Sequence, residues 1–310
     1  MVMHAYTCKV RTGLLMALSL CLPAAMFAAE SSFDRTLSVN GPVTLQVSTG
    51  SGYIHISSGP GNQVHVIGHV KASSAGRWLG VDPDDAVAKV SAAPPIDQAG
   101  NIIRIGNRRE DDLFRRVSID YEITAPRGAL LSAQTGSGDI QLSDLNGTVK
   151  AQTGSGDIHA TRLGAGSKLE TGSGTIEAND LAGSSILQTG SGDIRAQFSA
   201  AGDVTAGTGS GSVQLRNVQG ALKVQTGSGD LDITGQPASP WKLETGSGSI
   251  TLGVGNAHFT LDAETGSGSV KSDLPIAMQG SLNKHHITGT LNGGGPTVKA
   301  QTGSGDIRIH

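Results

Sequence analysis

Cysteine and aromatic residues are scarce in this 310-residue chain, which narrows the chemistry open to it. Both cysteines, Cys8 and Cys21, lie in the first 29 residues, so the rest of the chain can form no disulfide and no cysteine-based metal site. Aromatic residues make up 3% of the chain. This disfavours a sugar-processing enzyme, which uses aromatic rings and clustered carboxylates to bind and cleave its substrate. No His-Glu-x-x-His or Gly-Lys-Ser/Thr motif occurs, which argues against a zinc peptidase and a phosphate-binding loop.

Residues 1–29 contain the parts of a secretory signal: two basic residues, an apolar run over 13–22 and an exit of small residues. We expect cleavage after Ala28 or Ala29, export, and no transmembrane span in the mature chain, because the run is short for a span of roughly 20 residues. The residue before Cys21 is not small, which disfavours lipidation but leaves it open. The mature chain has 21 basic and 26 acidic residues, a net charge of −5 that disfavours nucleic-acid binding.

The regular feature of the chain is the phrase Thr-Gly-Ser-Gly, usually followed by a polar residue and then Ile, Leu or Val. It occurs ten times, beginning at Thr49, Thr135, Thr153, Thr171, Thr189, Thr208, Thr226, Thr245, Thr265 and Thr302. From the second copy to the ninth the spacing is 18 to 20 residues, and the last interval of 37 suggests two periods with one phrase degraded. A fixed period of this length predicts a stack of like units.

Each repeat alternates apolar and polar residues before and after the phrase, which is typical of half-buried strands. In one copy the residues expected to point inward are Val149, Ala151, Thr153, Ile158 and Ala160. The sequence therefore predicts an all-β fold, a right-handed parallel β-solenoid with coils of about 18 residues. The glycines of the phrase are expected to make the turn between strands through a positive φ; they include Gly136, Gly138, Gly154, Gly156, Gly172, Gly174, Gly190 and Gly192.

We divide the chain into a signal peptide (1–29), an irregular β-rich N-terminal cap (30–130) and the solenoid repeats (131–310). Strands are expected over 63–70, 101–105 and 117–124 of the cap. A short helix is expected with Asp82 as its N-cap and Pro83 at its first position. An atypical cap is what a repeat array needs at its end.

Three features together resemble a bacterial domain-of-unknown-function family, number 4097 in its series, labelled "putative adhesin". They are the repeated Thr-Gly-Ser-Gly-Asp-Ile, the lead-in Ile119-Asp120-Tyr121-Glu122-Ile123-Thr124-Ala125-Pro126, and the ending from Ile287 to Ile309. The resemblance covers nearly the whole mature chain and implies an exported β-solenoid of the cell envelope. It brings no catalytic residues.

Two groups of side chains are candidates for metal binding. The residue after the phrase is acidic at Asp139, Asp157, Asp193, Asp230 and Asp306, but Thr175, Ser212, Ser249, Ser269 and Tyr53 interrupt this lane. We interpret it as a stacked polar ladder rather than a calcium site, which needs several converging oxygens. His55, His65 and His69 are expected to point outward, where His55 and His65 on adjacent strands could form a pair. No third ligand is spaced for them, so no metal and no cofactor are expected.

Two charged features are candidates for binding a partner. Residues 108–116 form a loop rich in both charges that could meet anionic head groups, although a self-neutralising solvated loop is the simpler interpretation. An outward lane is formed by Lys150, Lys168, Lys223, Lys242 and Lys299. The next lane holds Gln134, Gln152, Glu170, Gln188, Gln225, Glu244, Glu264 and Gln301. The lysine lane could bind a repeating polymer, or be a solvated face with lateral charge pairing.

The sequence thus favours an exported, non-enzymatic scaffold or adhesin-like binding surface of a bacterial envelope, in the periplasm or at the cell surface. Its partner would be an envelope glycan, a lipid or a protein. Two alternatives stay open: an envelope-stress or signalling accessory that binds a membrane partner, and a carbohydrate-active β-helix enzyme. Clustered exposed acids along a groove would favour the enzyme, and a flat, uniform face would favour binding.

Overall fold

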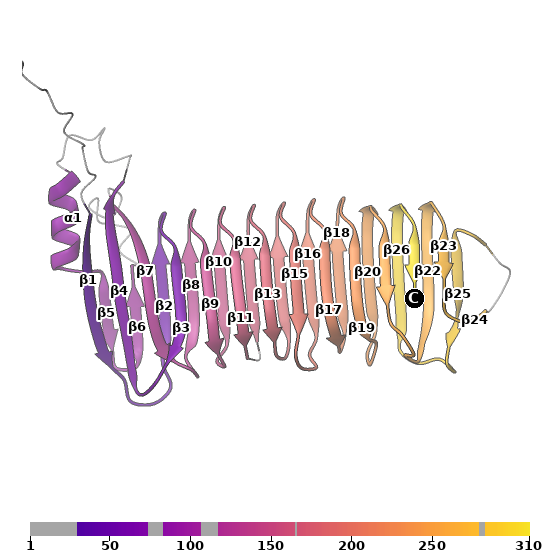
Figure 1. Cartoon of the computed structure of the whole chain (residues 1–310), viewed down its shortest axis with the longest axis horizontal. Coiled ribbons are helices and arrows are strands. Elements are labelled where there is room, and N and C mark those ends of the chain that lie inside the picture. The colour runs from indigo at the N-terminus through magenta and orange to yellow at the C-terminus, as the bar shows by residue number, and fades with distance from the viewer. Residues whose placement is uncertain (1–29, 74–82, 107–116, 165, 279–282) are drawn as a thin grey trace, which may run out of the picture.

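The computed structural model describes residues 30–73, 83–106, 117–164, 166–278 and 283–310. They form a β-solenoid, in which each regular coil gives one strand to each of two long sheets (Figure 1). Within the described ranges sheet A has 13 strands and sheet B has 14, and the one helix is α1 (Pro83–Ala92). The predicted all-β solenoid is confirmed.

The strands of each sheet follow one another along the long axis of the molecule. Sheet A contains, in spatial order, β1 (Glu30–Ser38), β4 (Gln63–Ala72), β7 (Val117–Pro126), β3 (Ile54–Gly59), β9 (Ile140–Leu145), β11 (Ile158–Leu163), β13 (Ile176–Leu181), β15 (Ile194–Phe198), β17 (Val213–Gln219), β19 (Leu231–Gln236), β21 (Ile250–Gly253), β27 (Ile307–Ile309) and β23 (Val270–Ser272). Sheet B contains β24 (Ala277–Met278), β25 (His286–Leu291), β22 (Phe259–Ser267), β26 (Thr297–Ser304), β20 (Trp241–Ser247), β18 (Leu222–Thr226), β16 (Val204–Thr208), β14 (Ser185–Thr189), β12 (Ser167–Thr171), β10 (Val149–Thr153), β8 (Leu130–Thr135), β2 (Thr44–Thr49), β6 (Ile102–Ile105) and β5 (Ile96–Ala99).

Equivalent residues of successive coils lie side by side in parallel register. Val149 pairs with Leu131 of the coil before it and with Ser167 of the coil after it. Val149, Ala151 and Thr153 are buried, as the alternation predicts. The core therefore runs as a continuous strip between the two sheets, and it also takes in the largest coil side chains, Trp241, Phe259 and Phe198.

The threonine of the phrase fastens each coil to the one before it. The buried Thr153 hydroxyl donates to the carbonyl oxygen of Gly138 in the preceding coil at 2.8 Å. The hydroxyl oxygen of Thr153 in turn accepts the backbone N–H of Gly156 at 3.1 Å. Matching pairs of bonds are made by Thr135, Thr171, Thr189 and Thr208. Because each of these hydroxyls donates and accepts at once, the buried threonine side chains leave no hydrogen-bonding group of their own unpaired.

The turn glycines have a different role from the predicted one. None of the eight glycines named above has φ in the left-handed range, so the positive-φ assignment is wrong. The structure instead requires them because adjacent coils approach closely. A Cβ built on Gly154 would lie 2.4 Å from the carbonyl oxygen of Gly136, and one on Gly156 would lie 2.0 Å from that of Gly138. Backbone stacked on backbone leaves no room for a side chain.

Positive φ occurs instead at the opposite corner of the coil, in four residues that the repeat pattern does not mark. Asp144, Arg162, Asp180 and Asn217 have φ of 61°, 53°, 58° and 61°. Each stands just before the buried apolar corner residue, and Asp and Asn tolerate this conformation better than most residues. At Arg162 the guanidinium donates two hydrogen bonds to Asp144, of 2.7 and 2.8 Å, which hold the two corners together.

The N-terminal end is closed by antiparallel strands and a helix. β4 pairs antiparallel with β1 and with β7, and α1 packs against β1 and β4 through the buried Ala86, Val87 and Val90. The predicted strands and the helix beginning at Pro83 are confirmed, and Asp82 lies outside the described residues. β2 and β3 pair in parallel with β8 and β9, so the first phrase already builds a coil of the stack. The boundary at residue 130 stays a proposal.

The C-terminal end departs from the sequence order of the coils. β26 lies between β20 and β22, and β27 lies between β21 and β23. The last coil of the chain is therefore inserted between two earlier coils (Figure 1). In the described residues of the 37-residue interval no further parallel coil follows β23, contrary to the expectation of a degraded repeat. The interval contains β25, which runs antiparallel to β22 and returns the chain so that β26 can enter the gap.

Two expectations lie outside the described residues: the secretory signal at 1–29 and the charged loop at 108–116. Both stay predictions. Within the described ranges no helix has the length and apolar character needed to cross a membrane.

Candidate functional site

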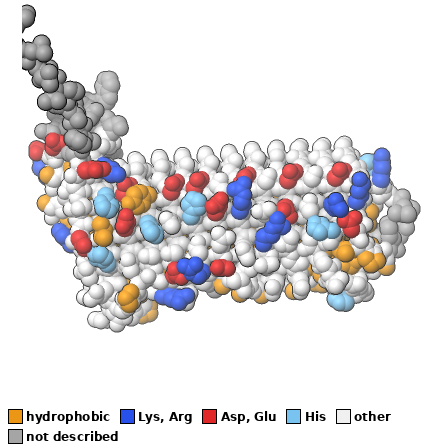
Figure 2. Space-filling model, in the orientation of Figure 1, with side chains coloured by type: hydrophobic (Ala, Val, Ile, Leu, Met, Phe, Trp, Pro, Cys, Tyr) orange, Lys and Arg blue, Asp and Glu red, His pale blue; other side chains and the backbone are white. Residues whose placement is uncertain are grey.

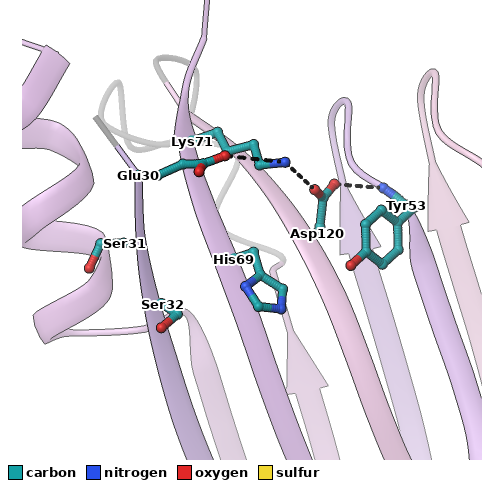
Figure 3. A pocket seen from close by; sticks show the side chains of 7 residues that line it. All are labelled: Glu30, Ser31, Ser32, Tyr53, His69, Lys71 and Asp120. Atoms are coloured by element: carbon teal, nitrogen blue, oxygen red, sulfur yellow. Dashed lines mark hydrogen bonds and ion pairs between the residues drawn. The ribbon is translucent and has the colours of Figure 1, made fainter. Parts of the chain in front are cut away.

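A shallow hollow lies on the outer face of sheet A at its N-terminal end, where β1, β4, β7 and the start of β3 meet (Figure 3). Its cavity volume is about 430 Å³, which falls within the range of roughly 300–1,000 Å³ typical of small-molecule sites. It is lined by Glu30, Ser31, Ser32, Tyr53, His69, Lys71 and Asp120.

Strand register brings these side chains together from distant parts of the sequence. Ser32 of β1 is opposite His69 of β4, and His69 is opposite Asp120 of β7. On the other side of β7, pairing of Ile54 with Tyr121 places Tyr53 next to Asp120. Three strand pairings, two of them antiparallel, thus assemble a row of polar side chains at one level of the sheet.

One lysine links the two carboxylates of the hollow. The Lys71 ammonium lies 3.3 Å from Glu30 Oε1 and 3.4 Å from Asp120 Oδ2 (Figure 3). Hydrogen bonds to Glu30 and then to Asp120 raise the pKa of Lys71, although the group is exposed. The other oxygen of Asp120 accepts the backbone N–H of Tyr53 at 3.0 Å. Asp120 is therefore fixed from two sides and is mostly buried.

Tyr53 is the one aromatic side chain of the described residues that is exposed, at 37% of its area. Its hydroxyl donates to Glu122 Oε1 at 2.9 Å, which holds the ring beside the hollow. Burial of the hydroxyl, followed by the hydrogen bond and charge of Glu122, raises the pKa of Tyr53 to about 12. The phenol consequently stays protonated at neutral pH and remains a hydrogen-bond donor.

The aspartates that follow the phrase form a backbone ladder. Asp139 accepts the N–H of Asp157 at 2.9 Å, and Asp157 accepts the N–H of Thr175 at 2.7 Å. Asp193, Asp230 and Asp306 accept the corresponding N–H of Ser212, Ser249 and Ser269. These carboxylates therefore hold neighbouring coils together. The described residues contain no group of three or more His, Cys, Asp or Glu side chains placed to hold a metal ion.

The histidine pair considered from the sequence does not form. β7 lies between β3 and β4, so His55 and His65 are on strands that are not neighbours. His65 instead contacts Asp34 at 2.7 Å, and His69 Nε2 lies 3.8 Å from Glu122. The expectation that these strands are adjacent is wrong, because β7 lies between them, parallel to β3 and antiparallel to β4. This strand order could not be read from the sequence.

The lysine lane is present on the outer face of sheet B but is not continuous. Lys150 pairs with Lys168, and Lys223 pairs with Lys242, which pairs with Lys299; Ile186 and Thr205 separate the two groups. The lane beside it supplies opposite charge, since the ammonium of Lys168 lies 2.9 Å from Glu170 and that of Lys242 lies 2.8 Å from Glu244.

The acidic partners in this second lane are stabilised in their charged form. The pKa of Glu244 is lowered by hydrogen bonds from Lys242 and Gln225. At Glu170 desolvation opposes the ionised form, but hydrogen bonds from Lys168 and Gln152 prevail and the pKa is lowered. Both lysine groups are thus paired laterally with carboxylates of the neighbouring lane.

Comparison with known proteins places the chain in a family. The Toastrack DUF4097 family model matches residues 121–310. The chain belongs to this family. The match begins within the lead-in strand β7, at Tyr121, and takes in every later coil. No curated protein matches the chain.

Solved structures of similar proteins share little sequence with this member of the Toastrack family. A "putative adhesin" from Parabacteroides distasonis is 13% identical, with a TM-score of 0.47 over 90% of this chain and 97% of that one. A "putative adhesin" from Bacteroides fragilis is 15% identical, with a TM-score of 0.40 over 90% and 97%. A "putative cell adhesion protein" from Clostridium sporogenes is 13% identical, with a TM-score of 0.23 over 90% and 98%. At these values the comparisons assign no ligand to the chain.

Proposed function

We propose that this Toastrack protein is an exported, non-enzymatic scaffold of a bacterial cell envelope that presents a ligand-binding surface on a rigid β-stack. The observation that carries the proposal is the use of the coil carboxylates. In the regular coils the aspartates of the ladder bind backbone N–H groups, and Glu170 and Glu244 are paired with lysines. Carboxylates that are held in hydrogen bonds and ion pairs support a structural and binding role.

The outer surface supports binding over catalysis. In Figure 2, charged side chains of both signs are spread along the coils, and hydrophobic side chains show mainly toward the two ends. A polysaccharide hydrolase needs a pair of carboxylates that flank the bond to be broken, one of them able to give up a proton. In the hollow the carboxylates of Glu30 and Asp120 instead share the ammonium of Lys71. This arrangement favours holding a ligand rather than cleaving it.

Export to the periplasm or the cell surface is part of the proposal and rests on the composition of residues 1–29. Separation of cells into cytoplasmic, periplasmic, membrane and medium fractions, followed by immunoblotting, tests it. A chain that keeps its first 29 residues and stays in the cytoplasm would reject export.

The binding role is tested with the purified mature protein. We would probe it against envelope glycans, lipid vesicles and an extract of envelope proteins, and assay the glycans for new reducing ends. Saturable binding without release of products is the expected result. Release of products would make the protein an enzyme, and failure to bind any of the three classes would reject the proposed function.

A further inference from the structure

We propose that the hollow beside Tyr53 binds one neutral, polyhydroxylated sugar unit of an envelope glycan. This inference rests on the proposed binding function and names its ligand class and its site. Three observations carry it: the residue at position 53, the unused hydrogen-bonding groups around it, and the sign of the local charge.

The residue at position 53 is not one that the fold requires. It occupies the place that directly follows the phrase, where the other nine copies have only Asp, Ser or Thr. The ladder bond needed there is a backbone N–H bond, and Asp120 accepts it without help from the tyrosine ring. A large exposed aromatic is therefore in excess of the structural need. A half-exposed ring with a polar tip is the side chain that packs against the apolar face of a sugar while its hydroxyl stays hydrogen-bonded.

Polar groups with spare capacity line the part of the hollow that extends from the ring across β7 and β4 to β1. The hydroxyl of Ser32, which is opposite His69 on the outer face of the sheet, can donate and accept. The second oxygen of Glu30 and the imidazole of His69 face the same space (Figure 3). Such donors and acceptors suit sugar hydroxyls, each of which both donates and accepts. A volume of about 430 Å³ suits one sugar unit of a longer chain better than a buried multi-unit groove.

The charge around the hollow selects against anionic ligands. Glu30, Asp120 and Glu122 contribute three negative charges, and Lys71 contributes one positive charge that is already shared between two of them. A phosphate or a uronic acid would meet net repulsion at short range, which is costly in a partly desolvated site. A neutral sugar meets no such cost.

The test uses the purified mature protein and oligosaccharides of four kinds: neutral hexose, N-acetylhexosamine, amino sugar with a free ammonium group, and uronic or phosphorylated sugar. Affinity is measured by calorimetry for the wild type and for Tyr53→Ser, which introduces a residue that other coils carry at this place. Ile186→Ser is the matched control, because it removes a similarly exposed apolar side chain (39%) from the outer face of sheet B. Thermal melts confirm that both variants fold.

We expect the wild type to bind neutral or N-acetylated sugars, Tyr53→Ser to lose at least tenfold in affinity, and Ile186→Ser to bind as the wild type does. Equal binding by Tyr53→Ser and the wild type would overturn the inference while the proposed function stood, since the glycan would then bind elsewhere. Preference for acidic or ammonium-bearing sugars would also overturn it. Binding of lipid or protein but of no sugar would overturn the ligand class alone.

Discussion

Replacement of a single stacking glycine by alanine separates the two explanations of the Thr-Gly-Ser-Gly phrase. In Gly154→Ala the new Cβ would lie 2.4 Å from the carbonyl oxygen of Gly136, whereas a normal contact needs about 3.4 Å or more. The neighbouring atom is backbone and cannot rotate away. The two coils must therefore move apart by about 1 Å at this turn, if they are to avoid the overlap.

The cost of that movement follows from the bonds beside it. The N–H of Gly154 bonds to the carbonyl oxygens of Thr135 and Gly136 at 3.2 and 3.1 Å, and an extra ångström breaks both. Two lost hydrogen bonds of about 0.5–1.5 kcal/mol each, added to overpacking strain of about 1–3 kcal/mol, give a destabilisation of about 2–6 kcal/mol. For a chain of this size the melting temperature should fall by roughly 3–10 °C.

The matched control is Gly50→Ala. Gly50 holds the same place in the first phrase, but a Cβ built on it meets nothing within 4 Å, because no coil turn lies beneath it. Its melting temperature should be close to that of the wild type, since Gly→Ala at an unstrained position is neutral or slightly stabilising. Circular dichroism melts of the two variants decide the matter. If both lower the melting temperature equally, the requirement for glycine lies within the turn itself and close stacking is the wrong explanation.

Three further predictions concern the ladders. Thr153→Val should destabilise the protein by about 1–3 kcal/mol in denaturant titration, because it leaves the N–H of Gly156 unpaired. Thr161→Val, on the outer face, should cost little. Equal costs would contradict the role of Thr153 in fastening one coil to the next. Melting curves in chelator and in millimolar calcium should overlay, because the ladder carboxylates already bind backbone N–H groups; a rise of many degrees with calcium would show a missed site. Because the pKa of Glu244 is lowered, its ion pair with Lys242 stabilises the fold above the ordinary glutamate pKa of about 4.3, and this contribution is lost as pH falls through the lowered folded pKa. Glu244→Gln should therefore lower the melting temperature more at pH 7 than in acid, and a pH-independent difference would contradict this.

The regular part of the fold could be predicted from the sequence because its determinants are local and repeated. Alternation over five residues fixes which face of a strand is buried, and in-register stacking carries that choice from coil to coil. Trp241 and Phe259, which stand at inward positions of this alternation, are accordingly buried. The helix could be predicted for the same reason, since Pro83 and the acids after it form a local start signal.

The candidate site could not be predicted because its residues meet through antiparallel pairings near one end. Glu30, Lys71 and Asp120 lie on β1, β4 and β7, whose order in the sheet follows no repeat. One signal was readable: Tyr53 breaks the small-polar pattern after the phrase. In the sequence it appears only as one of the residues that interrupt the lane of aspartates after the phrase. Its meaning depends on Asp120, which supplies the ladder bond from another strand.

The position of the last coil shows why a repeat phrase specifies a coil without specifying its place in the stack. Coils with the same register and turn can pair with any neighbour of the same kind, so chain order alone does not decide which two become adjacent. Here β25 turns the chain back along β22, and β26 then pairs with both β22 and β20. In a sequential stack the terminal coil is held on one side only and frays first. Insertion holds the C-terminal coil on both sides, so its release must break two interfaces at once, and the chain end becomes part of the interior of the stack.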